Sequence, residues 1–301
     1  MTRWPRHLAF TAALVGPFLG LLVSLEAAGA RQDPPAESHD PQRAIENAAS
    51  ISKVEVFFAT NRRREEVDKP GVHLGGGRGD PLFGICQAEF KSIPVMGEIA
   101  QKMPFYVPTE SSDQRVELQD DPEVFWDRLT EVVEATALQD VVVFIHGYSY
   151  DFERSCGRAA EAQRVLQGQA TVLMFTWPSD GDATGYDSDQ TDLDWSVPFL
   201  QDILSRVSEL LGPEHVHILA HSMGSRGVVQ ALARWKLERD QVPLIGRLVL
   251  LAPDLDAQMF VERLPGLLPL AESITLYASG TDTPLKFSHQ LNGSPRLGQA
   301  G

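Results

Sequence analysis

The sequence predicts an α/β fold, with a mostly parallel central sheet covered by helices on both faces. From residue 140 onward, short apolar runs alternate with longer helix-favouring segments, as in strands joined by crossover helices. The strand runs are continuously apolar, which is typical of strands buried on both faces. With 301 residues, 43% of them hydrophobic, the chain is long enough for one such domain.

Residues 1–30 have the composition of a signal peptide. Arg3 and Arg6 precede an apolar stretch over residues 8–25, and Ala28-Gly29-Ala30 provides small residues for cleavage. A retained anchor is the alternative, because the stretch approaches the length of a short membrane span. Residues 31–50, rich in Pro, Ala and acidic residues, predict a disordered tether before a folded domain over 51–301. We therefore expect a periplasmic or secreted protein with no stable membrane anchor after cleavage.

Net charge and cysteine content limit the kinds of partner and ligand that we expect. The formal charge of −15 argues against nucleic-acid binding through bulk electrostatics. Cys86 and Cys156 are the two cysteines, and the sequence leaves open whether they pair or stay free. Neither has a histidine or second cysteine at metal-ligand spacing, so we expect no metal site and no cofactor. The oligomeric state is left open.

The elements before residue 140 are expected in the following order. A first strand covers residues 54–59. The glycine-rich segment 71–79 is interpreted as a flexible surface turn, since it lacks the Gly-Lys-Ser/Thr ending of a phosphate-binding loop. An extended segment covers 99–107, and a helix covers 121–137, with acidic residues in its first turn.

The alternating part predicts five strands and the helices between them. The strands are expected over 141–145, 171–175, 215–219, 248–252 and 273–277. Helices are expected over 153–166, 197–211, 226–235 and 258–264, with another starting near Pro284. Ligands of such sheets bind at the carboxyl ends of the strands, which is where the candidate functional residues fall.

A serine nucleophile is predicted at Ser222. The segment Ala220-His221-Ser222-Met223-Gly224 lies between the strand 215–219 and a helix. A nucleophile on a sharp strand-to-helix turn needs small neighbours, because its backbone is strained and the helix passes close to the strand. Ala220 and Gly224 meet this requirement.

Two oxyanion donors are predicted beside that serine. One is the backbone N–H of Met223, directly after the nucleophile. The other comes from the loop that begins His146-Gly147-Tyr148, after the strand 141–145, and Gly147 and Tyr148 are the candidates. The two elements stand in the chain order that acyl-transfer enzymes on α/β sheets use.

The acid and the base are less clearly marked. Asp282, after the strand 273–277, is favoured as the catalytic acid. The alternative is Asp254, after the strand 248–252. Asp254 could instead cap the next helix. His289 is the histidine that follows Asp282, so it is the candidate base, with an ordinary surface histidine as the other interpretation. His221 is interpreted as packing at the turn.

A cluster of acidic residues follows Trp177-Pro178. It comprises Asp180, Asp182, Asp187, Asp189, Asp192 and Asp194. The cluster departs from a calcium loop at the twelfth position, where Thr191 replaces the bidentate Glu. We expect it to form the rim of a pocket, with apolar contacts from Trp177, Tyr186 and Trp195.

Six ordered blocks closely resemble a bacterial family of α/β-hydrolases catalogued as a domain of unknown function with esterase/lipase-like features. They are Val56 to Arg62, Phe144 to Tyr148, Phe175 to Ser179, Ala220 to Gly224, Leu251 to Asp256, and Leu276 to Ser279 with Asp282. The resemblance implies the α/β-hydrolase fold, nucleophile Ser222 and acid Asp282. The family pattern continues past Arg296-Leu297-Gly298 to a Gly-His-Ser-Tyr segment that carries the base. The printed sequence stops first, so we expect either a truncated record or a lost base, with the last strand and helix missing.

Two functions are therefore carried forward. The first is an exported serine hydrolase that cleaves carboxylic esters, with a small-molecule or lipid ester as substrate. The second is a catalytically impaired binding protein of the cell envelope that keeps the fold, motivated by the missing histidine. The acyl and alcohol groups of a substrate are not specified by the sequence.

Overall fold

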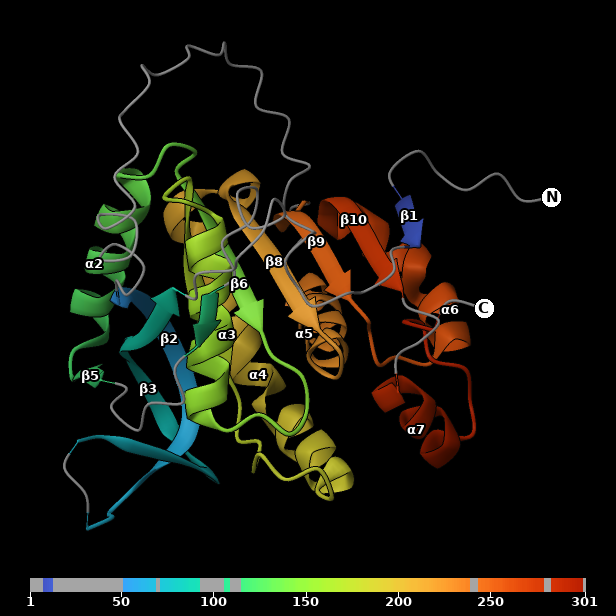
Figure 1. Ribbon diagram of the computed structural model, residues 1–301. Helices are drawn as coiled ribbons and strands as arrows, with labels where there is room; N and C mark the ends of the chain where they lie inside the picture. The colour runs from blue at the N-terminus through green and yellow to red at the C-terminus, as the bar shows by residue number, and fades with distance from the viewer. Residues whose placement is uncertain are drawn as a thin grey trace, which may run out of the picture.

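The computed structural model describes residues 8–12, 51–68, 71–92, 106–108, 115–238, 243–278 and 283–299. In this part of the chain, ten strands form one sheet, ordered β1-β10-β9-β8-β6-β7-β2-β3-β4 with β5 beside β3 (Figure 1). The strands are β1 Leu8–Ala12, β2 Ile51–Glu65, β3 His73–Ser92, β4 Tyr106–Pro108, β5 Arg115–Gln119, β6 Asp140–Ile145, β7 Ala170–Thr176, β8 Val216–His221, β9 Ile245–Leu251 and β10 Ala271–Ala278. The helices are α2 Pro122–Glu134, α3 Phe152–Val165, α4 Tyr186–Leu211, α5 Gly224–Glu238, α6 Ala257–Leu267 and α7 Thr283–Asn292.

The sheet is mostly parallel, as predicted. Each neighbouring pair from β1 through to β2 runs parallel, whereas β3 pairs antiparallel with β2, β4 and β5. The carboxyl ends of β2, β7, β6, β8 and β9 consequently meet along one edge of the sheet. The loops that follow these strands are therefore neighbours in space.

Helices cover both faces of the sheet, because successive strand residues point to opposite sides. On one side, Leu173 and Phe175 join a core with residues of α2, α4, α5 and α6. On the other side, Val172 and Met174 pack with Phe152 and other residues of α3. Figure 1 shows α3 in front of the sheet and α4 and α5 behind it. The chain has the α/β-hydrolase fold that the sequence predicted.

The prediction of a flexible turn over 71–79 was wrong. Residues 73–92 form the long strand β3, which pairs with β2 along the whole hairpin. The glycines let neighbouring groups approach the strand closely. A Cβ on Gly75 would overlap the Glu65 side chain, and one on Gly76 would overlap Asp180. A glycine-rich strand lets the hairpin lie against the loop after β7.

The helix predicted over 197–211 begins well before that range, at Tyr186. Its first turn contains Asp187 and Asp189, and negative side chains are favourable at a helix N-terminus. The acidic residues made this segment resemble a loop, although Tyr186, Asp189, Leu193 and Val197 bury one face at helical spacing.

Much of the N-terminal prediction lies outside the described residues, including the tether 31–50. Within the predicted signal peptide, residues 8–12 form β1, which pairs in parallel with β10 at the edge of the sheet. Cleavage near residue 30 stays a prediction; it would remove β1 and leave β10 at that edge. No helix in the described ranges combines the length and apolarity needed to cross a membrane.

The two cysteines form a disulfide. Cys86 lies on β3 and Cys156 on α3, and the bond joins residues 70 positions apart in the sequence. Both side chains are fully buried in the core on the α3 side of the sheet. The bond fixes α3, and with it the loop that precedes α3, to the β2–β3 hairpin.

Candidate active site

Ser222 occupies a strained turn between β8 and α5. Its φ is +50°, a left-handed conformation that is uncommon for residues other than glycine. The turn is held by β9: the Ser222 N–H donates to the Leu251 carbonyl (2.9 Å), and the Asp254 N–H donates to the Ser222 carbonyl (3.1 Å). Ser222 keeps 8% of its surface exposed. This is the backbone geometry expected of a nucleophile turn.

The loop after β6 touches that turn directly. A Cβ placed on Gly147 would lie 3.0 Å from the Ser222 Cβ. A Cβ on Gly224 would overlap the His146 carbonyl oxygen, so only glycine lets α5 begin against this loop. The predicted elements are therefore in contact, and the small residues at 147 and 224 make the contact possible.

Three backbone N–H groups at this contact are free of partners within the described part of the chain. In the turn, the N–H groups of Ser222, Ser225 and Arg226 donate to backbone carbonyls, whereas that of Met223 does not. In the loop, the N–H groups of Gly147 and Tyr148 likewise make no hydrogen bond to a described residue. These are the three donors that the sequence proposed for an oxyanion.

The rest of the loop is fastened to the buried carboxylate of Asp189. Ser149, with φ of +60°, donates its N–H to Asp189 (2.7 Å). Tyr150 donates its N–H to the Ser179 hydroxyl (2.9 Å), which donates to Asp189 (2.6 Å). Burial raises the pKa of Asp189, although its three donors, the third being the Asp180 N–H, oppose the rise. The loop conformation therefore depends on α4, which carries Asp189.

The His146 ring is buried between two aromatic rings and has both nitrogens engaged. It stacks on Trp177, with centroids 4.9 Å apart, and on Tyr150 at 5.6 Å. Nε2 lies 3.0 Å from the Thr176 hydroxyl and Nδ1 lies 2.7 Å from the Gly147 carbonyl. Burial, together with a nearby guanidinium charge, holds the pKa of His146 well below its ordinary value. His146 thus belongs to the scaffold of the loop.

His221 is a half-buried ring that is neutral near pH 7. Burial, with the nearby charge of Arg158, lowers the pKa of His221 to about 4. Its ring lies edge-on to Tyr150, and its Nδ1 is 2.9 Å from the position of a Cβ on Gly147. This placement agrees with the predicted packing role at the turn.

The structure describes only one of the two candidate acids. Asp282 lies outside the described residues. Asp254 is buried and accepts from the Tyr186 hydroxyl (2.9 Å), the Ser288 hydroxyl (2.6 Å) and the Arg296 Nε (2.6 Å). These contacts account for Asp254 without a catalytic role, since they fasten α7 and the segment 293–299 to the end of β9.

His289, the candidate base, lies on α7. Its Nδ1 is 3.1 Å from the side-chain oxygen of Gln299, and the ring is half-buried. Both interpretations of His289, as the base and as an ordinary surface histidine, stay predictions.

The expected aromatic rim is wrong for Trp177 and Trp195. Trp177 is fully buried beneath His146, because its ring completes the stack described above. Trp195 is 41% exposed and lies under the Arg78 guanidinium, on α4. The acidic residues also have separate partners: Asp192 pairs with Arg78, and Asp194 pairs with Arg226.

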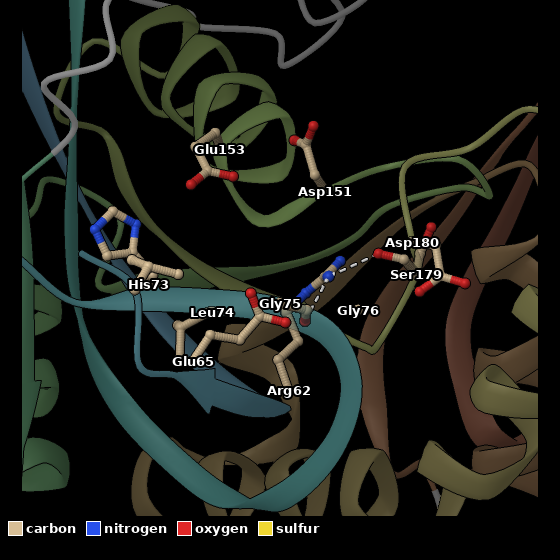
Figure 2. A pocket seen from close by; sticks show the side chains of 11 residues that line it. Arg62, Glu65, His73, Leu74, Gly75, Gly76, Asp151, Glu153, Ser179 and Asp180 are labelled. Atoms are coloured by element: carbon tan, nitrogen blue, oxygen red, sulfur yellow. Dashed lines mark hydrogen bonds between the residues drawn. The ribbon is translucent and has the colours of Figure 1, made fainter. Parts of the chain in front are cut away.

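A cavity of about 340 Å³ lies beside this loop system rather than at Ser222. Figure 2 shows Arg62 within it, below Asp151, which caps α3, and Glu153 of α3, and beside Ser179 and Asp180. None of its lining residues is a predicted catalytic residue. In the described ranges, no three His, Cys, Asp or Glu side chains are grouped to hold a metal ion.

Sequence reasoning missed the polar residues that build the site's scaffold: Arg62, Thr176 and Asp189. Arg62 and Thr176 fall inside quoted motif blocks, but nothing in their local pattern distinguishes them from ordinary strand-end residues. Their importance follows from contacts between segments that are distant in the sequence, such as the hydrogen bond from Arg62 to Tyr150.

The comparison with protein families agrees with this fold. A family model described as alpha/beta hydrolase of unknown function (DUF900) matches residues 123–301. Among solved structures, EstE5-PMSF is 13% identical with a TM-score of 0.29, and the match covers 78% of this chain and 60% of EstE5. Esterase Est22 is 16% identical with a TM-score of 0.31, and the match covers 85% of this chain and 72% of Est22. None of the curated proteins searched matches the chain.

Proposed function

The chain belongs to the alpha/beta hydrolase family of unknown function DUF900, and on that premise we propose that it is an exported serine hydrolase that cleaves carboxylic esters. The observation that carries the proposal is the turn at Ser222. A strained serine lies against Gly147, and the free N–H groups of Gly147, Tyr148 and Met223 surround this contact. The strain and the free donors are what acyl transfer requires and what packing alone does not explain.

In the proposed reaction, the Ser222 hydroxyl attacks the ester carbonyl and loses its proton to a general base. The carbonyl oxygen becomes an oxyanion, which accepts hydrogen bonds from Met223 N–H and from the loop N–H groups. The alcohol leaves with a proton, and an acyl-enzyme remains on Ser222. Water then releases the carboxylic acid by the same steps. Asp282 is the proposed acid of the catalytic set, and a small-molecule or lipid ester is the proposed substrate.

Covalent labelling tests the nucleophile. A fluorophosphonate probe should add to the natural full-length protein, and peptide mass spectrometry should place the adduct on Ser222. Ser222→Ala should abolish labelling. Ser225→Ala is the matched control, because Ser225 lies in the first turn of α5, fully buried, with its hydroxyl 3.4 Å from the Ala220 carbonyl. Labelling of another residue, or none in the folded protein, would contradict the proposal and favour the envelope-binding alternative.

The base is tested separately. We expect His289→Ala to keep the ester hydrolysis rate within about twofold, because the half-buried ring already hydrogen-bonds Gln299. Loss of the base from a serine triad lowers kcat by several orders of magnitude. A fall of that size in a folded His289→Ala variant would therefore identify His289 as the base.

Export is supported by two observations of different kinds. Residues 1–30 have the composition of a signal peptide, and Cys86 and Cys156 form a disulfide, which persists in oxidising compartments. Mass spectrometry of the protein isolated from its natural host should find an N-terminus near residue 31 and no free thiol. An intact N-terminus with two free thiols would contradict export.

A further inference from the structure

Arg62 is a fully buried cation whose hydrogen bonds go to neutral groups. Its Nε donates to the Thr176 hydroxyl (2.9 Å), and its Nη2 donates to the Tyr150 carbonyl (2.7 Å). Its Nη1 donates to the carbonyls of Ser179 (2.8 Å) and Gly75 (3.3 Å), drawn as dashed lines in Figure 2. Burial lowers the pKa of Arg62 to about 10, although surrounding carboxylates oppose the fall. A buried charge is unfavourable unless its donors are satisfied, so these acceptors define the position of the guanidinium.

The three carbonyl acceptors come from one strand and two loops near the carboxyl edge of the sheet. Gly75 lies on the β2–β3 hairpin, Ser179 follows β7, and Tyr150 follows β6. One planar group therefore fixes the mutual position of three segments, because the guanidinium presents its donors in a rigid fork.

A second route from Arg62 ends on the same loop after β6. The Thr176 hydroxyl accepts from the Arg62 Nε and lies 3.0 Å from Nε2 of His146. A carbonyl oxygen only accepts, so Nδ1 of the neutral imidazole carries the ring proton and donates to the Gly147 carbonyl, 2.7 Å away. Nε2 is then the acceptor, and the Thr176 hydroxyl donates to it. The Gly147 carbonyl therefore sets the tautomer of His146.

The two routes hold the loop at both ends. One reaches Tyr150 directly, and the other reaches Gly147 through Thr176 and His146. Between these points lies Tyr148, and at the near end a Cβ on Gly147 would touch Ser222. Movement of Arg62 would therefore change the place of the loop N–H groups relative to the serine.

We propose that Arg62 is a positioning residue, which holds the loop 147–150 against Ser222 so that its N–H groups meet the oxyanion. The inference rests on the proposed function for its catalytic consequence. Its structural part, the anchoring of the loop, can be tested by a measurement that does not depend on catalytic activity. By strand count, Arg62 lies three strands from β8, or about 14 Å across the sheet at the usual strand spacing, so it acts through the loop and does not touch substrate.

The kinetic test compares neighbouring arginines. Arg62→Lys keeps the charge and loses the fork, and it should lower kcat for a p-nitrophenyl ester about 10- to 100-fold while KM changes less than about threefold. Arg63→Lys is the matched control, since Arg63 is the next residue on β2 and is exposed. It should keep kcat and KM within about twofold of the natural protein.

Amide hydrogen exchange tests the anchoring independently. Exchange over residues 146–151 should be at least about tenfold faster in Arg62→Lys than in Arg63→Lys, whereas exchange in the core of α5 should be equal in both. Thr176→Val removes the route through His146 together with the acceptor of the Arg62 Nε, and it should also speed exchange in this loop. Thr176→Ser keeps the hydroxyl and should restore the slow exchange.

The outcomes separate the two claims. If neither Arg62→Lys nor Thr176→Val speeds exchange over 146–151 beyond the Arg63→Lys control, the positioning role is wrong. Should Arg62→Lys fail to fold, the Thr176→Val and Thr176→Ser pair decides the question alone. If the loop loosens while the natural protein shows no labelling at Ser222, the proposed hydrolase fails and the anchoring stands.

Discussion

Two buried arginines, Arg62 and Arg296, hold the two sides of this site in different ways. Arg296 pairs with the carboxylate of Asp254 at 2.6 Å and ties the C-terminal segment to the end of β9. Arg62 donates to three carbonyls and a hydroxyl, and its hydrogen bonds reach strand β3 and the loops after β6 and β7. A directly paired charge fastens one segment to another, whereas a charge satisfied by carbonyls sets the positions of several loops. We therefore expect changes on the Asp254 side to affect mainly stability, and changes at Arg62 to affect mainly the loop.

The largest effect is expected from Arg296→Met. It leaves the Asp254 carboxylate buried without its cation, which should lower the free energy of unfolding by about 3–5 kcal/mol. Urea denaturation measures this difference. Arg247→Met is the control, because Arg247 is exposed on β9 and should change stability by less than about 0.5 kcal/mol. A loss below about 1 kcal/mol in Arg296→Met would mean that the pair does not fasten this side.

The next effect concerns the disulfide on the Arg62 side. Reduction should lower the free energy of unfolding by about 4 kcal/mol, since the bond closes a loop of about 70 residues in the unfolded chain. Urea midpoints with and without reductant give the value. A double variant, Cys86→Ala with Cys156→Ala, should not respond to reductant. Equal midpoints for the oxidised and reduced natural protein would show that the bond contributes nothing here.

The acid dependence of stability should report on His221, which lies between the two sides. Its folded pKa of about 4 is below the ordinary 6.5, so the unfolded chain binds the proton first as pH falls. The contribution of His221 is full above about pH 6.5 and falls by at most about 3 kcal/mol as the pH reaches 4, since the ring is only half-buried. His221→Gln should show a smaller loss over that window in urea titrations at pH 7 and pH 4.5. An equal loss in both proteins would contradict the lowered pKa of His221 in the folded protein.

The smallest effect is a stabilisation that should be the same on both sides. Gly157 in α3 and Gly266 in α6 have no atom within 4 Å of an added Cβ. Gly157→Ala and Gly266→Ala should each raise the free energy of unfolding by about 0.5–1 kcal/mol, because alanine restricts the unfolded chain and favours the helix. Thermal melts measure both shifts. A destabilisation at either position would mean that the space beside that helix is filled.

Local patterns predicted the parts of the fold that depend on neighbouring residues. Continuous apolar runs predicted β6, β7, β8, β9 and β10, and their alternation with helices predicted the parallel order. The small residues around Ser222 predicted a strained turn, which its φ of +50° confirms. The role of Ser222 as nucleophile stays a prediction.

Other parts depend on contacts that local patterns do not contain. The glycines of 73–79 resemble a turn in sequence, but they lie in a strand because side chains such as Glu65 and Asp180 occupy the space of their missing side chains. The acidic start of α4 also resembles a loop in sequence, but it forms a helix in which Asp189 is buried. Ser149 and Ser179, which come from other loops, donate hydrogen bonds to Asp189. The Arg62 network joins residues 62, 146–150 and 176–179, and no short segment shows that they meet.

The most direct test of Ser222 as a nucleophile facing an oxyanion site is a crystal structure of the phosphonylated protein. We predict a covalent bond from the Ser222 Oγ to phosphorus. We also predict that the phosphoryl oxygen accepts hydrogen bonds, roughly 2.7–3.1 Å long, from Met223 N–H and from Gly147 or Tyr148 N–H, as expected of oxyanion donors. A phosphonate attached to another residue, or a phosphoryl oxygen directed to solvent with these N–H groups unpaired, would contradict the assignment.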